Sequence, residues 1–339
     1  MVLCVMVASA LDPVLEADHG LPGSQIVNCS VQKSVGCRVT REAQGKVPGD
    51  GVQLAFGYWP GYGMPVVALH GLTTSYVNFI GIAECLAGRR ALLALDLRGR
   101  GDSDKPDSPY GMAQHARDVA VAMRAMGIGP SVIVGHSMGA FVAAALAAQE
   151  PMLVSGVVMI DGGYLPAVDP VATTNSGNSS ALLERVMQLR ETYPSRQAYI
   201  DHWRSQPHFP QADWGPWVEA LLSYEVTGET TVRPKAIEAG VRADLMEAFQ
   251  IGEITARLQA IRVPALLLRA EAGFLPGQPP LLSDAVADEI CKLTPHIRDH
   301  KLTGTTHYTL VIGRRGATQI ADLVDDFARR CDLGTPSTT

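Results

Sequence analysis

A serine stands at the centre of residues 135–139, which read Gly-His-Ser-Met-Gly. The β-branched run 131–134 precedes this segment, and the alanine-rich stretch 138–149 follows it. A G-x-S-x-G pattern between a strand and a helix places its serine on a sharp turn, where glycines two positions before and after avoid steric clashes. The N-terminal end of the helix then stabilises negative charge that develops near the hydroxyl. The pattern therefore predicts that Ser137 is a nucleophile.

Three further segments place polar residues after apolar runs. His70 and Gly71 follow residues 66–69, a loop at 96–104 follows the next run, and His307 lies in a polar loop after residues 297–302. In this order and spacing, the segments resemble the α/β-hydrolase superfamily, in the branch with a serine nucleophile and a cap between core strands six and seven. The resemblance covers about residues 50–330 and is more specific for the fold than for the substrate.

The resemblance implies a base and an oxyanion hole. The superfamily order of serine, acid and histidine puts the base in the loop before the final helix, which is the position of His307. His296 and His300 flank or lie within residues 297–302 and fit a loop position poorly. The backbone N–H groups of Leu72 and Met138 are the implied donors to the oxyanion.

The acid of the triad is left open by the sequence. Many relatives carry it after strand seven, but here Gly273 occupies the usual aspartate position and Glu271 lies two residues before it. Other branches place the acid directly after strand six, where Asp161 ends the apolar run 157–160 and two glycines follow. We expect Asp161 to be the acid, with Glu271 as the main alternative and Asp284 as a further one.

The remaining polar residues of these segments are expected to be structural. Arg98 and Asp102 belong to the loop 96–104, which in similar proteins shapes the turn beside the site. His70 and His136 are expected to orient loops, and neither is the predicted base.

The elements that position these residues alternate along the chain. From residue 50 onward, short apolar runs alternate with longer helical stretches, which is typical of a mostly parallel sheet with helices on both faces. We predict an α/β fold of the α/β-hydrolase type, with a helical cap inserted after strand six. The expected strands are 53–58, 66–69, 91–96, 131–134, 157–160, 265–269 and 297–302, and the expected helices are 76–87, 112–126, 138–149, 284–293 and 317–330.

The alternation breaks between residue 162 and about residue 263, a segment too long for a plain connection. It contains three of the four tryptophans (Trp203, Trp214 and Trp217), which either line an apolar pocket or form the cap's own core. The expected organisation is an N-terminal extension at 1–48, a core at 49–163 and 262–333, and a cap at 164–261.

Composition excludes several classes of protein. The chain has 339 residues, of which 47% are hydrophobic and 18% are charged, and its net charge of −6 with no basic block argues against a nucleic-acid partner. No apolar run reaches the ~18 residues that span a bilayer. Six scattered cysteines suggest free thiols and a cytoplasmic protein. Residues 2–11 resemble a short secretion signal, but no Lys or Arg precedes Lys33.

The expected function is a serine hydrolase that cleaves an ester or lactone bond of a small to medium apolar substrate through an acyl-enzyme. No cofactor and no metal are expected, and the oligomeric state is not predicted. A serine nucleophile argues against dehalogenase or epoxide hydrolase chemistry, which uses a carboxylate in this fold. The alternatives are a C–C bond hydrolase of aromatic degradation, a cofactor-free perhydrolase or oxygenase, and a slow-turnover ligand receptor.

Overall fold

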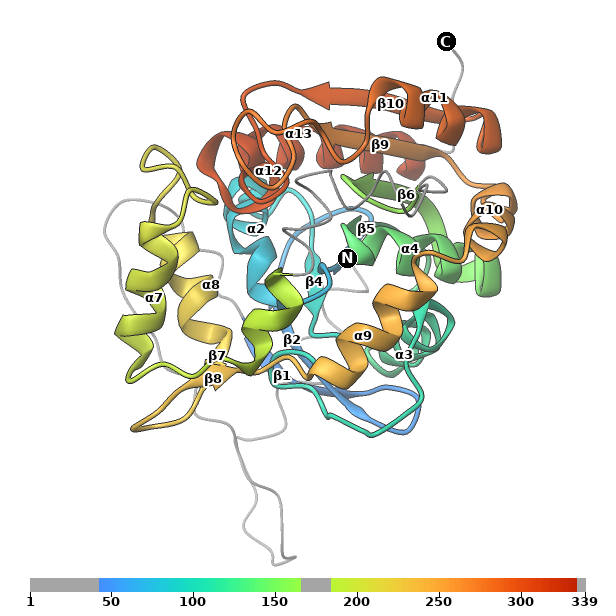
Figure 1. The fold of residues 1–339 in the computed structure, drawn as a ribbon. Helices are drawn as coiled ribbons and strands as arrows, with labels where there is room; N and C mark the ends of the chain where they lie inside the picture. Colours follow the sequence, from blue (N-terminus) through green and yellow to red (C-terminus); the bar gives the residue numbers. More distant parts are fainter. Residues whose placement is uncertain (1–42, 166–183, 334–339) are drawn as a thin grey trace, which may run out of the picture.

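An eight-stranded sheet forms the centre of the protein in a computed structural model that describes residues 43–165 and 184–333 (Figure 1). The strand order is β1-β2-β4-β3-β5-β6-β9-β10, and β2 runs antiparallel to both of its neighbours whereas the strands from β4 to β10 are parallel. The bounds are β1 Ala43–Pro48, β2 Gln53–Trp59, β3 Val66–Leu69, β4 Leu92–Leu95, β5 Ser131–His136, β6 Val154–Ile160, β9 Ala265–Ala270 and β10 Ile297–Leu302.

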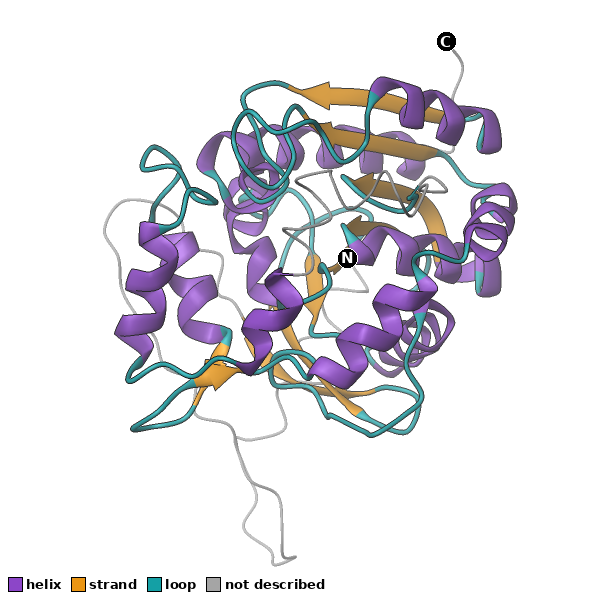
Figure 2. Ribbon diagram, viewed as in Figure 1, coloured by secondary structure: helices purple, strands orange, loops and turns teal. Residues whose placement is uncertain are grey.

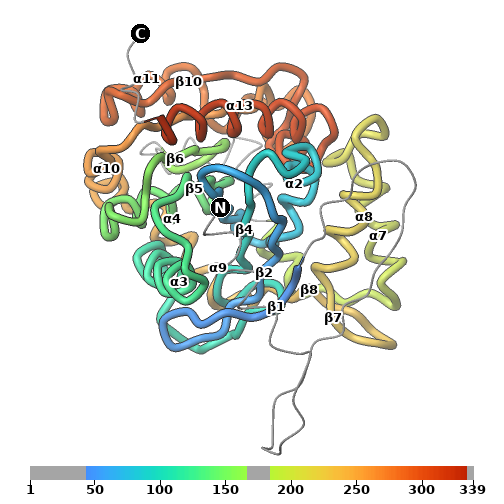
Figure 3. The backbone as a smooth tube through the Cα atoms, turned by 180° about the vertical axis from the view of Figure 1, so that it is seen from behind, coloured from blue at the N-terminus to red at the C-terminus, as the bar shows by residue number. Residues whose placement is uncertain are grey.

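Helices cover both faces of this sheet, as Figure 2 shows. One face packs against α3 (Met112–Ala125), α4 (Met138–Gln149), α10 (Ile251–Ala260) and α11 (Asp284–Leu293). The other face packs against η1 (Tyr76–Phe79), α2 (Ile80–Leu86), α12 (Thr309–Ile312) and α13 (Arg314–Asp332). Of these, α2 and α13 can be followed from behind in Figure 3. Because both faces are covered, every residue of β3, β4, β5 and β9 is buried, which explains why their sequences are apolar apart from Ser131, His136 and Arg269.

The predicted fold class is confirmed, and two of the expected boundaries shift. Residues 43–48 form β1, an edge strand paired with β2, so this part of the expected N-terminal extension belongs to the sheet. The sequence signal was weak because Val47 is the single buried residue of β1. The rest of the extension, including the apolar residues 2–11, lies outside the described residues.

The helical segment between β6 and β9 lies beside the core in Figure 1 and is called the cap below, after its expected role. Its elements are η3 (Gln188–Arg190), α7 (Arg196–Ser205), α8 (Pro216–Tyr224), a short hairpin of β7 (Val226–Thr227) and β8 (Arg233–Pro234), and α9 (Glu238–Glu247). The following helix, α10, was expected in the cap but belongs to the core. Its Ile254 and Leu258 join the hydrophobic cluster that contains α4, because they face the sheet layer one helical turn apart. Residues 166–183 of the expected cap lie outside the described residues.

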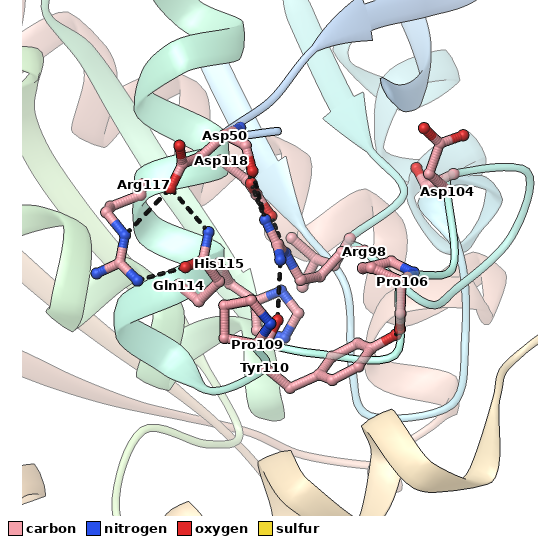
Figure 4. A network of polar contacts seen from close by, with 12 residues as sticks. Asp50, Arg98, Asp104, Pro106, Pro109, Tyr110, Gln114, His115, Arg117 and Asp118 are labelled. Atoms are coloured by element: carbon pink, nitrogen blue, oxygen red, sulfur yellow. Dashed lines mark hydrogen bonds and ion pairs between the residues drawn. The ribbon is translucent and has the colours of Figure 1, made fainter. Parts of the chain in front are cut away.

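A buried arginine holds the loop that follows β4 (Figure 4). The Arg98 guanidinium donates to both carboxylate oxygens of Asp118 on α3, at 2.5 and 2.6 Å, and to the carbonyls of Pro109 and Asp50, at 2.8 and 2.9 Å. In the same loop, Asp102 forms an ion pair of 2.8 Å with Lys235 of the cap. These contacts are structural, as the sequence predicts for Arg98 and Asp102.

The Arg98–Asp118 pair gives a test of this structural role. We expect Arg98→Met to lower the free energy of unfolding by about 3–5 kcal/mol, because Asp118 is left as a buried charge without its partner. Arg124→Met is the matched control: its ion pair with Glu150 is exposed, and we expect a loss of less than about 1 kcal/mol. Urea unfolding followed by circular dichroism measures both. Equal losses in the two variants would contradict a special role of the buried pair.

Candidate active site

The turn at Ser137 joins β5 to α4 in a strained conformation. Ser137 has φ 55° and ψ −117°, and its N–H donates to the Ile160 carbonyl at 2.9 Å. A side chain at Gly135 would collide with the carbonyl of Gly139, and a side chain at Gly139 would collide with the carbonyl of Leu69. Both glycines are therefore required by the close approach of backbone segments, and the strain they permit exposes the serine partly at the edge of the sheet.

His307 and Asp161 form a buried pair next to this turn. His307 lies in the loop between β10 and α12, and its Nδ1 is 2.7 Å from Oδ2 of Asp161. The other carboxylate oxygen accepts the Ala270 N–H at 3.2 Å, and the backbone N–H of His307 donates to the Gly273 carbonyl at 2.9 Å. Asp161, which directly follows β6, also has a positive φ of 45°. The imidazole is therefore fixed by contacts from two neighbouring strand ends.

The two alternative acids have other partners. Glu271 is exposed and accepts the Gly304 N–H at 2.6 Å. Asp284 is also exposed and pairs with Arg269 and Lys301, at 2.9 and 3.2 Å. Of the three candidate carboxylates, Asp161 is the one that contacts the imidazole of His307.

Two further histidines position the loops of the site. His136 Nδ1 accepts from the Asn78 amide at 3.2 Å, so its Nε2–H donates to the His307 carbonyl at 3.0 Å. Likewise, His70 Nε2 accepts the Leu97 N–H at 2.9 Å, and its Nδ1–H donates to the Gly71 carbonyl at 2.7 Å.

Burial keeps both of these histidines neutral. It lowers the pKa of His136 well below its usual range and the pKa of His70 to about 3, because the charged imidazolium would lose its hydration. Their contacts agree with the predicted loop-orienting role. Asn78, which fixes the tautomer of His136, was not singled out by the sequence.

The loop after β3 lies against Ser137. A side chain at Gly71 would meet Ser137 Oγ at 3.7 Å, and Leu72 is the next residue. Met138 is the first residue of α4, where a backbone N–H has no acceptor within the helix. Leu72 therefore belongs to a loop that approaches Ser137, and Met138 follows the serine directly in the chain; that their N–H groups bind an oxyanion stays a prediction.

Arg100 is a residue of this site that sequence reasoning missed. It is fully buried and donates to the Leu72 carbonyl at 3.0 Å. This hydrogen bond fixes the peptide group between Leu72 and Thr73. Its guanidinium forms an ion pair of 2.6 Å with Asp244 of α9, and Asp244 also contacts His115 Nε2 at 2.9 Å. A cap helix is thereby tied to the loop that carries Leu72. The feature of the sequence that could have pointed to Arg100 is that the loop 96–104 contains a second arginine in addition to Arg98.

Ser137 opens onto two cavities of about 660 and 510 Å³, both counted with the space open to solvent. One of the two expected roles of the cap aromatics, the lining of a pocket, is seen for Trp203, and Trp217 has a role that was not expected. Trp203 and Phe209 line the larger cavity, whereas Trp217 packs on Gly81 of α2 and donates its indole N–H to Glu84 at 2.8 Å. The cap therefore both roofs a pocket and packs on the core.

Within residues 43–165 and 184–333, no group of three or more His, Cys, Asp or Glu side chains is arranged to hold a metal ion. The cysteines of these ranges, Cys85, Cys291 and Cys331, are free thiols. None of the helices in the described part of the chain is both long enough and apolar enough to cross a membrane.

Comparison with known proteins identifies the family. The model of the family described as alpha/beta hydrolase fold matches residues 64–313, and the chain belongs to this family. The 2-(acetamidomethylene)succinate hydrolase of Mesorhizobium japonicum is 28% identical over 258 residues, which cover 73% of this chain and 83% of the relative.

A second relative and a solved structure are also similar to this chain. The sn-1-specific diacylglycerol lipase of Mus musculus is 35% identical over 138 residues, which cover 39% of this chain and 42% of the lipase. A crystal structure of E-2-(acetamidomethylene)succinate hydrolase superposes with a TM-score of 0.71 at 23% identity, over 85% of this chain and 99% of the other. That structural likeness shows the shared fold, and the relatives named here are hydrolases.

Proposed function

We propose that this chain is a serine hydrolase that transfers an acyl group from an ester or lactone to water through an acyl-enzyme. The observation that carries the proposal is the 2.7 Å contact between His307 Nδ1 and Asp161 at the edge of a cavity that Ser137 also lines. A carboxylate at Nδ1 holds the proton there, so Nε2 is left free to accept the proton of a serine hydroxyl.

In the proposed reaction, Ser137 Oγ attacks the substrate carbonyl carbon while His307 Nε2 takes the hydroxyl proton. Asp161 stabilises the imidazolium that forms. The imidazolium then gives its proton to the leaving oxygen, and the ester bond breaks to leave an acyl group on Ser137. A water molecule then attacks the acyl carbon while His307 takes its proton. The bond between the acyl carbon and Ser137 Oγ breaks, the imidazolium returns the proton to Oγ, and the acid is released.

The oxyanion of each tetrahedral intermediate is proposed to accept from the Leu72 and Met138 N–H groups. A single donor of this kind contributes about 3–4 kcal/mol when measured by its removal in another serine hydrolase. The Arg100 bond to the Leu72 carbonyl supports the proposal, because it fixes the loop that would present one donor.

Hydrolysis of an amide is the second candidate. The relative from Mesorhizobium japonicum is named for a substrate that carries an acetamido group, which is an N-acyl compound. The murine relative is named as a lipase of diacylglycerol, which is an ester. The same residues would serve both bonds, but an amide requires His307 to protonate a nitrogen before it leaves.

A matched pair of substrates separates the two candidates. We expect phenyl butanoate to be hydrolysed with a kcat/KM at least 10-fold above that of butananilide, because phenolate leaves far more readily than anilide. Product formation is followed by mass spectrometry, and a short incubation is used to detect butanoyl-Ser137 in the intact protein. Faster cleavage of the anilide would favour the amide candidate.

A vinylogous 1,5-diketone, a substrate of C–C bond hydrolysis, is included as the third arm. Its cleavage without turnover of either acyl compound would overturn the proposed acyl transfer. Absence of turnover in all three arms, with no acylated Ser137, would do the same.

A further inference from the structure

The two cavities that meet at Ser137 differ in their polar groups. Ser137, Leu72 and Phe274 line both, whereas His307 lines the larger cavity and Met138 the smaller one. Both cavities are lined mainly by apolar side chains, among them Phe141, Leu245 and Leu282 in the smaller one. The smaller cavity also contains the carboxylates of Asp161 and Asp244, but these are already paired with His307 and with Arg100 and His115. The larger cavity contains two ionisable cap residues, Arg185 and Glu225.

The position of His307 assigns the two halves of a substrate. In acyl transfer the imidazole protonates the leaving group, so the leaving group must lie on the imidazole side of the serine. That side is the larger cavity. The acyl group then extends past Met138 into the smaller, apolar cavity.

Arg185 is the cationic group on the leaving-group side. Its guanidinium lies 4.3 Å from the centre of the Trp203 ring and donates to Thr73 Oγ1 and Gln188 Oε1, at 3.1 and 3.2 Å. Both acceptors are neutral. The Tyr199 hydroxyl also interacts with the guanidinium, and Glu225 acts on it electrostatically without a close ion pair. A guanidinium has five N–H donors, so several remain for a ligand.

Glu225 does not neutralise this cation by direct contact. Its carboxyl accepts from the Tyr199 hydroxyl at 3.4 Å, and burial raises its pKa, although the nearby charge of Arg185 opposes this shift. Because Glu225 forms no direct ion pair with it, the Arg185 guanidinium is held by stacking and by neutral acceptors and can contact a ligand in the larger cavity.

Two further polar side chains line the larger cavity. Thr74 interacts with Glu225 and Trp203 with Tyr199. Among the described residues, however, the buried Thr74 Oγ1 and Trp203 Nε1 have no hydrogen bond of good geometry, and no residue of the smaller cavity has such an atom. Buried polar groups are normally hydrogen-bonded, so the larger cavity is the one of the two that favours a polar ligand.

We propose that the larger cavity binds a carboxylate on the leaving group of the substrate through Arg185, while the smaller cavity binds an apolar acyl group. Arginine suits this role because its planar fork matches the two oxygens of a carboxylate. The proposal rests on the proposed function for the assignment of leaving group and acyl group. It names the substrate class as apolar acyl esters or amides of a hydroxy or amino acid with a free carboxylate.

Three esters test the assignment. Phenyl butanoate is the neutral reference, 3-carboxyphenyl butanoate places a carboxylate on the leaving group, and the monophenyl ester of butanedioic acid places it on the acyl group. We expect KM for 3-carboxyphenyl butanoate to be roughly 10- to 100-fold below that of the reference, as charge-assisted hydrogen bonds predict. The ester with the acyl carboxylate is expected to have a KM above the reference.

Arg185→Gln should remove the advantage of the leaving-group carboxylate, so that the KM values for 3-carboxyphenyl butanoate and phenyl butanoate become equal within about 3-fold. Arg185→Lys should restore part of the advantage, because it keeps the charge without the fork. Arg190→Gln is the matched control, since Arg190 is exposed and pairs with Glu238 outside both cavities.

Equal increases of KM for the neutral and the charged ester in Arg185→Gln would show that Arg185 only supports the cap, and would overturn the proposal. A preference for the acyl carboxylate would also overturn it. Calorimetric binding of 3-hydroxybenzoate and of phenol to Ser137→Ala gives a readout that does not depend on turnover. Arg185-dependent binding of 3-hydroxybenzoate alone supports the carboxylate site even if none of the esters is hydrolysed, which separates this proposal from the proposed function. Equal binding of the two phenols would overturn it.

Discussion

Ser137→Ala is expected to lower kcat for the ester substrates by about 10⁶-fold, the scale found for removing the nucleophile of another serine hydrolase. The loss is large because the variant has no atom that can form the acyl-enzyme, and His307 and Asp161 then have no hydroxyl to activate. Labelling by a fluorophosphonate probe should be lost together with turnover. Stopped assays with a high enzyme concentration measure the residual rate.

The fold should survive this substitution, which makes the result interpretable. Alanine replaces serine without adding atoms to the turn, and the Ser137 N–H bond to Ile160 is a backbone contact that is retained. Ser131→Ala is the matched control: Ser131 begins the same strand, and its hydroxyl donates to the Gly129 carbonyl at 2.8 Å, away from the cavities. Persistent labelling of Ser137→Ala, with the same thermal midpoint as the unmodified chain, would remove Ser137 from its proposed role.

The parts of the fold that the sequence predicts best are those with strong local patterns. The predicted helix 138–149 and strand 297–302 have the bounds of α4 and β10. Continuous apolar runs also located the buried strands, because helices on both faces leave no exposed side to break the pattern. The edge strand β1 has one buried residue and no such run, so it was missed.

The sequence predicts those parts of the site whose chemistry depends on residues that are close together in the chain. The glycines around Ser137 are such a case, because steric contact within one turn requires them. The acid is different, since Asp161 and His307 are 146 positions apart and meet only through the order of the strands. The sequence could therefore propose Asp161 but could not separate it from Glu271.

The residues around the cavities were even harder to predict from the sequence. Arg185 contacts Thr73, which is 112 positions away in the chain, and stacks on Trp203 of α7. No local spacing connects these three residues, and the path of the cap alone brings them together. Arg100 was missed for a similar reason, because its role depends on Asp244 of α9.

Asp161→Asn is expected to lower kcat by about 10⁴-fold, the scale known for the acid of a serine protease triad. The amide of asparagine can donate to His307 Nδ1, which would place the imidazole proton on Nε2 and prevent that nitrogen from accepting the proton of Ser137. KM should change little, because Asp161 is buried behind the imidazole. Steady-state kinetics with phenyl butanoate measures both parameters, and the thermal midpoint shows whether the buried substitution is tolerated.

Glu271→Gln and a double variant make the Asp161 result decisive. Glu271 is exposed and its amide analogue can still accept the Gly304 N–H, so Glu271→Gln should retain kcat within about 3-fold. Residues that act as one unit give strongly non-additive losses. Ser137→Ala combined with Asp161→Asn should therefore be no slower than Ser137→Ala alone, because the carboxylate acts only through the hydroxyl that His307 deprotonates. A further loss of 10²-fold or more in the double variant would mean that Asp161 contributes by a route other than the His307 imidazole. A 10⁴-fold loss in Glu271→Gln would instead transfer the role of the acid to the loop after β9.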